Sequence, residues 1–200
     1  RIFDYTPLGT SSWTQVGADI DGEAADDNSG YSVSLSSDGS RVAIGAHKND
    51  AGGTNSGHVR IYQYNNNSWS QLGADIDGEA ANDYSGYSVS LSSDGSRLAI
   101  GTILNDGNGT NSGLVRIYDY NGSAWAQVGA DIDGEAAGDQ FGRPVSLSSD
   151  GSRVAIGGPY NDGNGSNSGH VRVYSISSGD SYQYAWDIDS GGAPSCLLYT

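Results

Sequence analysis

The sequence is poor in several residue types, and each shortage excludes a class of protein. It contains one cysteine, Cys196, so no disulfide can form within the chain and a disulfide-stapled scaffold is excluded. Nine lysines and arginines face 24 aspartates and glutamates, and the formal net charge of -15 argues against binding to nucleic acid or to an anionic membrane surface. No apolar run approaches the roughly 18 residues of a transmembrane helix, so membrane insertion is not expected.

The most informative feature that is present is a recurring segment. GYSVSLSSDGSRVAIG at residues 30–45 returns almost unchanged at 86–101 and, with an altered start, at 141–157. Large apolar residues alternate with serine before the SDGS turn and with alanine or glycine after it, which is the pattern of two paired β-strands. Asp-Gly is typical of tight hairpin turns, because glycine accepts a positive φ without a Cβ clash. The segment therefore predicts a β-hairpin.

The hairpin belongs to a longer repeat. The motif GADIDGEAA begins at residues 17, 73 and 129, so the period is 56 residues (73 − 17 and 129 − 73). A shortened fourth copy, DID, begins at residue 187, where the same period places it. Repeats of this length are typical of solenoids, propellers and arrays of similar units.

Each repeat predicts four strands, which in the first unit cover residues 31–36, 41–46, 57–64 and 68–76. One face of the hairpin is bulky and the other small, as sheets stacked face to face require. We therefore expect an all-β fold, a β-propeller of four-stranded antiparallel blades, with a β-trefoil or β-prism as the alternatives for a threefold repeat. The expected domain covers residues 1–200, with a partial blade at 1–20, blades at about 30–76, 86–132 and 142–188, and a C-terminal strand or tail at 189–200.

The third unit carries the residues of a known repeat. It opens with Phe141-Gly142, ends its second strand in GGP at 157–159, and continues with SGHVRVY at 168–174. These residues resemble the FG-GAP repeat of the integrin α-subunit type of β-propeller, and the resemblance covers all three units. The family's calcium loop, of the form DxDxDGxxD, is replaced here by SDGS between the first two strands, so calcium is not transferred to that position.

The resemblance and the repeat lead to an expected function. FG-GAP propellers of this type imply a secreted or cell-surface adhesion module, so we expect an extracellular, non-enzymatic domain that binds a protein or glycan ligand. A carbohydrate-binding lectin and a structural subunit of a surface polymer or larger complex are the alternatives. The near-identical repeats favour the structural alternative, and repeated tryptophans favour the lectin.

Ring closure determines which partners are expected. The segments 1–5 and 13–20 read as the last two strands of a partial unit, and 195–200 as one more strand. These pieces either join into a fourth sheet and close a small ring, or the chain is a segment of a larger propeller, or it associates with another copy. An exposed apolar blade face favours a partner, either a homo-oligomer or adjoining sequence.

Two sets of oxygen-bearing residues are candidate cation sites. The first occupies the loop between the second and third strands, where alternating oxygen donors suit a hard cation such as calcium and glycines permit a tight wrap. A turn held by its own side chains is the other interpretation. The residues are Asp106, Asn108, Thr110, Asp162, Asn164 and Ser166, whereas the first unit has Ala51-Gly52 in place of Gly-Asn and is not expected to bind calcium.

The second set lies in the GADIDGEAA motif, where close carboxylates repel one another unless they are solvated or neutralised by a cation. A solvated acidic loop is the alternative, and a glycosidase pair is disfavoured because one loop repeated three times does not build a single cleft. No nucleophile motif or phosphate-binding loop is present, so no catalytic residues are expected. The second-choice metal residues are Asp19, Asp21, Glu23, Asp75, Asp77, Glu79, Asp131, Asp133 and Glu135.

Three tryptophans recur near the start of the fourth strand, at Trp13, Trp69 and Trp125. An exposed indole can stack on the apolar face of a sugar ring, which would make these residues the ligand-binding set of a lectin. The alternative is that they cover the outer edge of each blade by packing.

Overall fold

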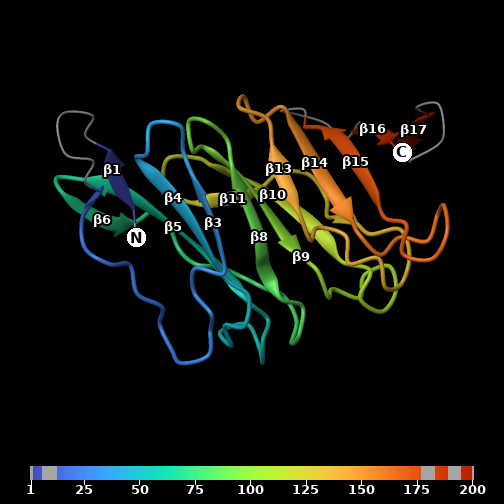
Figure 1. The fold of residues 1–200 in the computed structure, drawn as a ribbon, viewed down its shortest axis with the longest axis horizontal. Coiled ribbons are helices and arrows are strands. Elements are labelled where there is room, and N and C mark those ends of the chain that lie inside the picture. The colour runs from blue at the N-terminus through green and yellow to red at the C-terminus, as the bar shows by residue number, and fades with distance from the viewer. Residues whose placement is uncertain (1, 6–12, 177–182, 189–194, 200) are drawn as a thin grey trace.

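The computed structural model describes residues 2–5, 13–176, 183–188 and 195–199, and in that part of the chain all regular secondary structure is β (Figure 1). A terminal pair is formed by β1 (Phe3–Tyr5) and β2 (Trp13–Gln15). Sheet 1 contains β3 (Ser32–Leu35), β4 (Arg41–Ala46), β5 (His58–Asn65), β6 (Ser68–Gln71) and β7 (Ile76–Asp77). Among the described residues, no helix is long and apolar enough to span a bilayer.

Sheets 2 and 3 repeat this arrangement. Sheet 2 contains β8 (Ser85–Leu91), β9 (Arg97–Thr102), β10 (Leu114–Tyr120), β11 (Trp125–Gln127) and β12 (Ile132–Asp133). Sheet 3 contains β13 (Val145–Leu147), β14 (Arg153–Gly158), β15 (His170–Ser175), β16 (Gln183–Ile188) and β17 (Ser195–Tyr199). Every named pairing is antiparallel, which confirms the predicted antiparallel units.

The predicted hairpin is confirmed in each unit. Val33 lies opposite Ile44 in sheet 1, and the second strand has the predicted bounds of 41–46. In the turn, the Asp38 carboxylate accepts hydrogen bonds from the Ser36 hydroxyl at 2.7 Å and the Ser40 amide at 2.9 Å. The Ser36 and Ser40 bonds lower the pKa of Asp38 to about 2.

The fourth strand differs from the prediction, because the expected strand at 68–76 is split into β6 and β7. Both halves pair with β5, but Val59 faces Ile76 whereas Tyr62 faces Gln71, so the outer strand has extra residues between the two pairings. Gly73 lies in this bulge with a φ of 84°, a conformation that glycine adopts without a steric cost. In sheet 3, Ile188 pairs with Val171 just as Ile76 pairs with Val59. The shortened fourth copy of the motif therefore has the same strand register as the full copies.

The inner hairpin of sheet 1 lays small residues such as Ser34 and Gly45 against sheet 2, as predicted, whereas the third strand contributes larger ones. One apolar core joins Ala43, Val59 and Ile61 of sheet 1 to the large residues of sheet 2, and a second joins sheet 2 to sheet 3 in the same way. Close approach depends on glycine, since a Cβ at Gly45 would overlap the carbonyl oxygen of Gly86. The core therefore lies between the sheets rather than inside any one of them.

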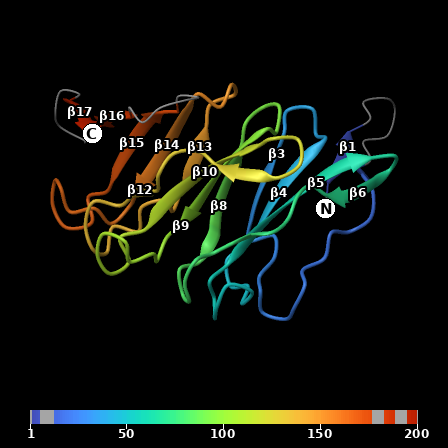
Figure 2. The same ribbon diagram turned by 180° about the vertical axis from the view of Figure 1, so that it is seen from behind.

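The three sheets form an open row of propeller-type blades, with the two chain ends at opposite ends of the row (Figures 1 and 2). Strands β3, β8 and β13 of neighbouring sheets lie against one another, as expected for the inner strands of successive blades. Among the described residues, β1 pairs with β2 alone and β17 pairs with β16. Within these residues the terminal strands do not form one fourth sheet, because β17 extends sheet 3.

The serine that joins neighbouring sheets gives a first prediction. The Ser90 hydroxyl accepts a hydrogen bond from the Leu147 amide at 2.9 Å, and the equivalent Ser34 accepts one from Leu91 at 2.9 Å. Ser90→Ala should lower the free energy of unfolding by about 1–2 kcal/mol, because a partly buried amide loses its acceptor. Urea unfolding measures this, with the exposed equivalent Ser146→Ala as the matched control that should change little. Equal effects of the two changes would contradict the assigned role.

Candidate functional site: a charged seam beside the outer strands

A buried arginine occupies the same place on the third strand of each sheet. Arg60, Arg116 and Arg172 are 7%, 5% and 6% exposed, and they recur at the 56-residue period. Each guanidinium meets a glutamate from the GADIDGEAA loop that leads into its own sheet: Arg60 bonds Glu23 at 3.0 Å, Arg116 bonds Glu79 at 2.5 Å and Arg172 bonds Glu135 at 2.6 Å. The loop between two blades is thereby fixed to the blade that follows it.

In sheet 2 a second carboxylate completes the site. Arg116 donates from Nε and from a terminal nitrogen to the two oxygens of Asp131, at 2.9 and 2.7 Å. This two-point contact lowers the pKa of Asp131, since the arginine stabilises the charged carboxylate. Gln127 also donates to Asp131, at 2.8 Å.

These contacts change the interpretation of the acidic motif. For Glu23, Glu79, Glu135 and Asp131, the neutralising cation is an arginine of the chain itself. These arginines were assigned no role from the sequence, and this pairing was missed. The available signal was the recurrence of one arginine per unit between two apolar residues of the third strand.

The remaining second-choice residues have different surroundings. Asp19 and Asp75 accept hydrogen bonds from the glutamines four residues before them, at 2.7 and 2.5 Å. The backbone carbonyl of Asp21, rather than its carboxylate, accepts from Arg60 at 3.3 Å. Burial raises the pKa of Asp133, because desolvation disfavours its charged form.

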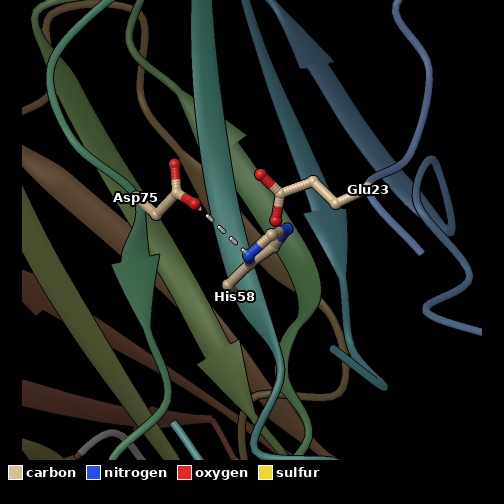
Figure 3. Close-up of side chains that lie close together, drawn as sticks. All are labelled: Glu23, His58 and Asp75. Carbon is tan, nitrogen blue, oxygen red and sulfur yellow. Dashed lines mark ion pairs between the residues drawn. The ribbon is translucent and has the colours of Figure 1, made fainter. Parts of the chain in front are cut away.

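Sheet 1 differs from sheet 2 at one position, and the difference creates a new cluster. His58 stands where sheet 2 has Leu114, and its side chain lies between Glu23 and Asp75 (Figure 3). The ring is 1% exposed, and Nδ1 forms no hydrogen bond within the described residues. Nδ1 lies 3.8 Å from an Asp75 oxygen and 3.9 Å from an Asp77 oxygen, too far for hydrogen bonds.

The cluster has the chemistry of a metal site. One potential ligand atom from each of Glu23, His58 and Asp75 lies within 4.8 Å of the others. Burial lowers the pKa of His58, which keeps the imidazole neutral, the form that binds a metal. A histidine with two carboxylates is a ligand set that zinc accepts. The sequence alone missed it because no local spacing connects residues 23, 58 and 75.

The first-choice calcium residues lie in exposed turns at one end of the sheets. Asp106 accepts a hydrogen bond from the Asn111 amide at 2.8 Å, and Asp162 accepts one from the Asn167 amide at 2.7 Å. Asp50 makes the same contact with Asn55, at 2.7 Å. The side-chain amide of Asn108 donates to the Gly134 carbonyl at 2.9 Å, while Thr110, Asn164 and Ser166 are exposed. Turn formation accounts for the two aspartates, and calcium binding there remains a prediction.

The turns are tied to the interblade loops by a buried pair that sequence reasoning did not identify. The Asn49, Asn105 and Asn161 amides donate to Asp27, Asp83 and Asp139, at 2.8, 2.9 and 2.9 Å. Desolvation raises the pKa of Asp83, because burial disfavours the charged form of the carboxylate. The pairing fixes the two loop families relative to each other at the same end of the molecule.

The tryptophans join the outer edges of the blades. The Trp69 indole donates to the Val16 carbonyl at 2.9 Å, and Trp125 donates to the Leu72 carbonyl at 2.9 Å. Both rings are partly buried, and each packs against a tyrosine of its own sheet. Trp13 is 67% exposed. These contacts give Trp69 and Trp125 a packing role between sheets.

A groove lies along the seam between sheets 2 and 3. Its volume is about 520 Å³. It is lined by Asn108 and Tyr174 and by four charged residues, Asp131, Asp133, Glu135 and Arg172.

The bidentate contact in sheet 2 gives a second prediction. Asp131→Asn should lower the free energy of unfolding at neutral pH by about 1–2 kcal/mol, because a buried guanidinium loses a charged acceptor. The native pKa of Asp131 lies below its unfolded value, so its contribution is present above the unfolded pKa, near 3.9, and is lost as the pH falls. Chemical unfolding at several pH values measures both effects. Glu79→Gln, at a carboxylate that is 63% exposed, should cost less, and an equal or larger cost would contradict the assignment.

Comparison with known proteins places these units in a family. A search of curated proteins finds no sequence match. Among solved structures, a Bacteroides uniformis protein provisionally assigned as a 6-phosphogluconolactonase is similar in fold, with a TM-score of 0.53 and 12% identity. The match covers 97% of this chain and 62% of that protein, so the chain spans less than two thirds of its length. The FG-GAP repeat is matched three times, at residues 18–62, 74–118 and 130–174, and the chain belongs to the FG-GAP repeat family.

Proposed function

We propose that this chain is a non-enzymatic binding module that acts in adhesion outside the cell or at the cell surface. The observation that carries the proposal is the groove beside Arg172, in a member of the FG-GAP family. Its polar lining suits a protein or glycan that presents hydroxyl groups or basic groups. The similar structure shares 12% sequence identity with this chain, which is a likeness of fold alone, so its lactonase assignment is not carried over.

The groove is lined both by a sheet residue and by a loop residue. The sheet residue is Arg172, which forms an ion pair with Glu135 at 2.6 Å. The loop residue is Asn108, on an exposed turn that recurs in the third unit, and its side-chain amide bonds the Gly134 carbonyl. Binding residues on loops above a rigid sheet are common, because the sheet supplies position and the loop supplies variety.

A lectin that stacks sugars on its tryptophans receives less support. Trp69 and Trp125 are bonded to backbone carbonyls of the preceding outer strand, so their indole nitrogens already have partners. Glycan recognition through the acidic groove remains within the proposal, since carboxylates and amides accept and donate hydrogen bonds to sugar hydroxyls.

The proposed ligand site gives a third prediction. Labelled intact chain should bind at least one member of an array of extracellular proteins and glycans, and the double change Asn108→Ala with Asp133→Asn should weaken that binding about tenfold or more. Asp94→Asn, in a hairpin turn outside the groove, is the matched control and should bind as the original chain does. Equal binding by the groove variant, or binding to no member of the array, would contradict the proposal.

We further propose that cations stabilise the module, and this gives a fourth prediction. Zinc should bind at Glu23, His58 and Asp75, and calcium at the Asp106 and Asp162 turns. Calorimetry should record zinc binding that His58→Leu removes, a change that copies the leucine of sheet 2 and so preserves the fold. It should record calcium binding that Asp106→Ala with Asp162→Ala removes. Heat that is absent, or unchanged in the matching variant, would refute each site separately.

A further inference from the structure

The bulky face of sheet 1 is open, whereas the same face of sheet 2 is covered. Val33 and Leu35 of β3 are 64% and 47% exposed, while the equivalent Val89 and Leu91 of β8 are 9% and 7% exposed. Sheet 1 covers β8 through Ser34, whose hydroxyl accepts the Leu91 amide. Exposed apolar rows of this kind favour a contact with another polypeptide.

The terminal pair already occupies the outer half of the space over this face. Trp69 of sheet 1 bonds the Val16 carbonyl, just as Trp125 of sheet 2 bonds the Leu72 carbonyl of sheet 1. The terminal pair therefore has the position of the outer strands of a preceding blade. A complete sheet from a second copy would collide with it, so the occupant must be smaller than a blade.

The inner half of the same space is a cavity of about 470 Å³. Val33, Leu35 and Ile44 form one wall, and Ile2 and Ile20 contribute to the other. Within the described residues β1 pairs on one side only, with β2, whereas the equivalent strands β5 and β10 also pair with β4 and β9. The space thus adjoins a strand edge that can accept two further strands.

The hydrogen bonds from sheet 1 to sheet 2, and from sheet 2 to sheet 3, indicate which groups an occupant of the open face must present. Ser32 and Ser88 donate to the carbonyls of Gly86 and Gly142, at 2.7 and 2.6 Å. Arg41 and Arg97 donate to the carbonyls of Gly95 and Gly151, at 3.0 and 2.8 Å. On the open face the equivalent acceptors are the carbonyls of Gly30 and Gly39, and the equivalent donor is the Leu35 amide. A matching segment presents serine, serine two residues later, and arginine seven residues after that, across a tight turn.

We propose that this face is completed by an inner β-hairpin of the FG-GAP type, supplied by a partner polypeptide. Its second strand adds to the open edge of β1, and its small-residue face lies on Val33, Leu35 and Ile44. Alanine and glycine on that second strand permit the close approach that Gly45 makes to Gly86. The inference rests on the geometry of the seams and is independent of the ligand proposed for the groove.

The test uses a labelled peptide with the sequence of residues 86–101, which contains the hairpin of sheet 2, and the intact chain. Fluorescence anisotropy should show saturable binding at one peptide per chain, and hydrogen exchange should show new protection in β1 and β3. A peptide with valine at the positions of Ser88 and Ser90 should bind about tenfold more weakly, because the larger side chains prevent close stacking.

Variants of the chain locate the contact. Val33→Glu should reduce peptide binding about tenfold or more, and folding should be retained because Val33 is 64% exposed. Val171→Glu changes a valine that is 44% exposed at the far end of the row, and it should bind as the original does.

Three outcomes would overturn the inference. The natively folded chain fails to bind the peptide, or it binds both peptides equally. The third is self-association that Val33→Glu abolishes and the peptide does not displace, which would mean that a second copy covers the face.

Discussion

The close stacking of one sheet on the next is the constraint on which the rest of the structure depends. Neighbouring backbones approach so closely that a Cβ at Gly45 or Gly101 would overlap a carbonyl oxygen of the following sheet. Packing at this distance gains dispersion and buries apolar area, but it leaves no room for water to satisfy polar groups. The serine hydroxyls and the arginines of the hairpins supply the missing hydrogen bonds. These serines and arginines recur from unit to unit because they form the contacts between neighbouring sheets.

Much of this architecture could be predicted from the sequence, because its cause is local. Alternation of large and small residues defined the two faces, the 56-residue period defined the units, and the SDGS segment defined the turn. The split of the outer strand could not be predicted, since Gly73 allows a continuous strand as readily as a bulge. The position of β17 depends on pairing with β16, a choice that no local pattern determines.

The contacts between the buried arginines and the carboxylates were harder to predict, because they join residues far apart in the chain. Nine carboxylates at regular positions suggested an added cation, and the pairing of Arg116 with Asp131 and Glu79 is visible only in three dimensions. An arginine buried among apolar residues is costly unless it is fully paired. That cost explains why acidic loops accompany the arginine in every unit, and it makes the net charge of -15 partly structural rather than only a feature of the surface.

Repetition also separates scaffold from function. Some positions where one sheet meets the next hold the same residue, as at Gly45 and Gly101, since each must fit a carbonyl oxygen of the following sheet. Positions outside that constraint are free to differ, and the sequence differs at 58, 114 and 170, which hold histidine, leucine and histidine. Leucine at 114 leaves Asp131 bound to Arg116, whereas histidine at 58 lies 3.8 Å from Asp75. Histidine at 58 thus adds a potential ligand atom beside two carboxylates, Glu23 and Asp75, that the fold already brings together.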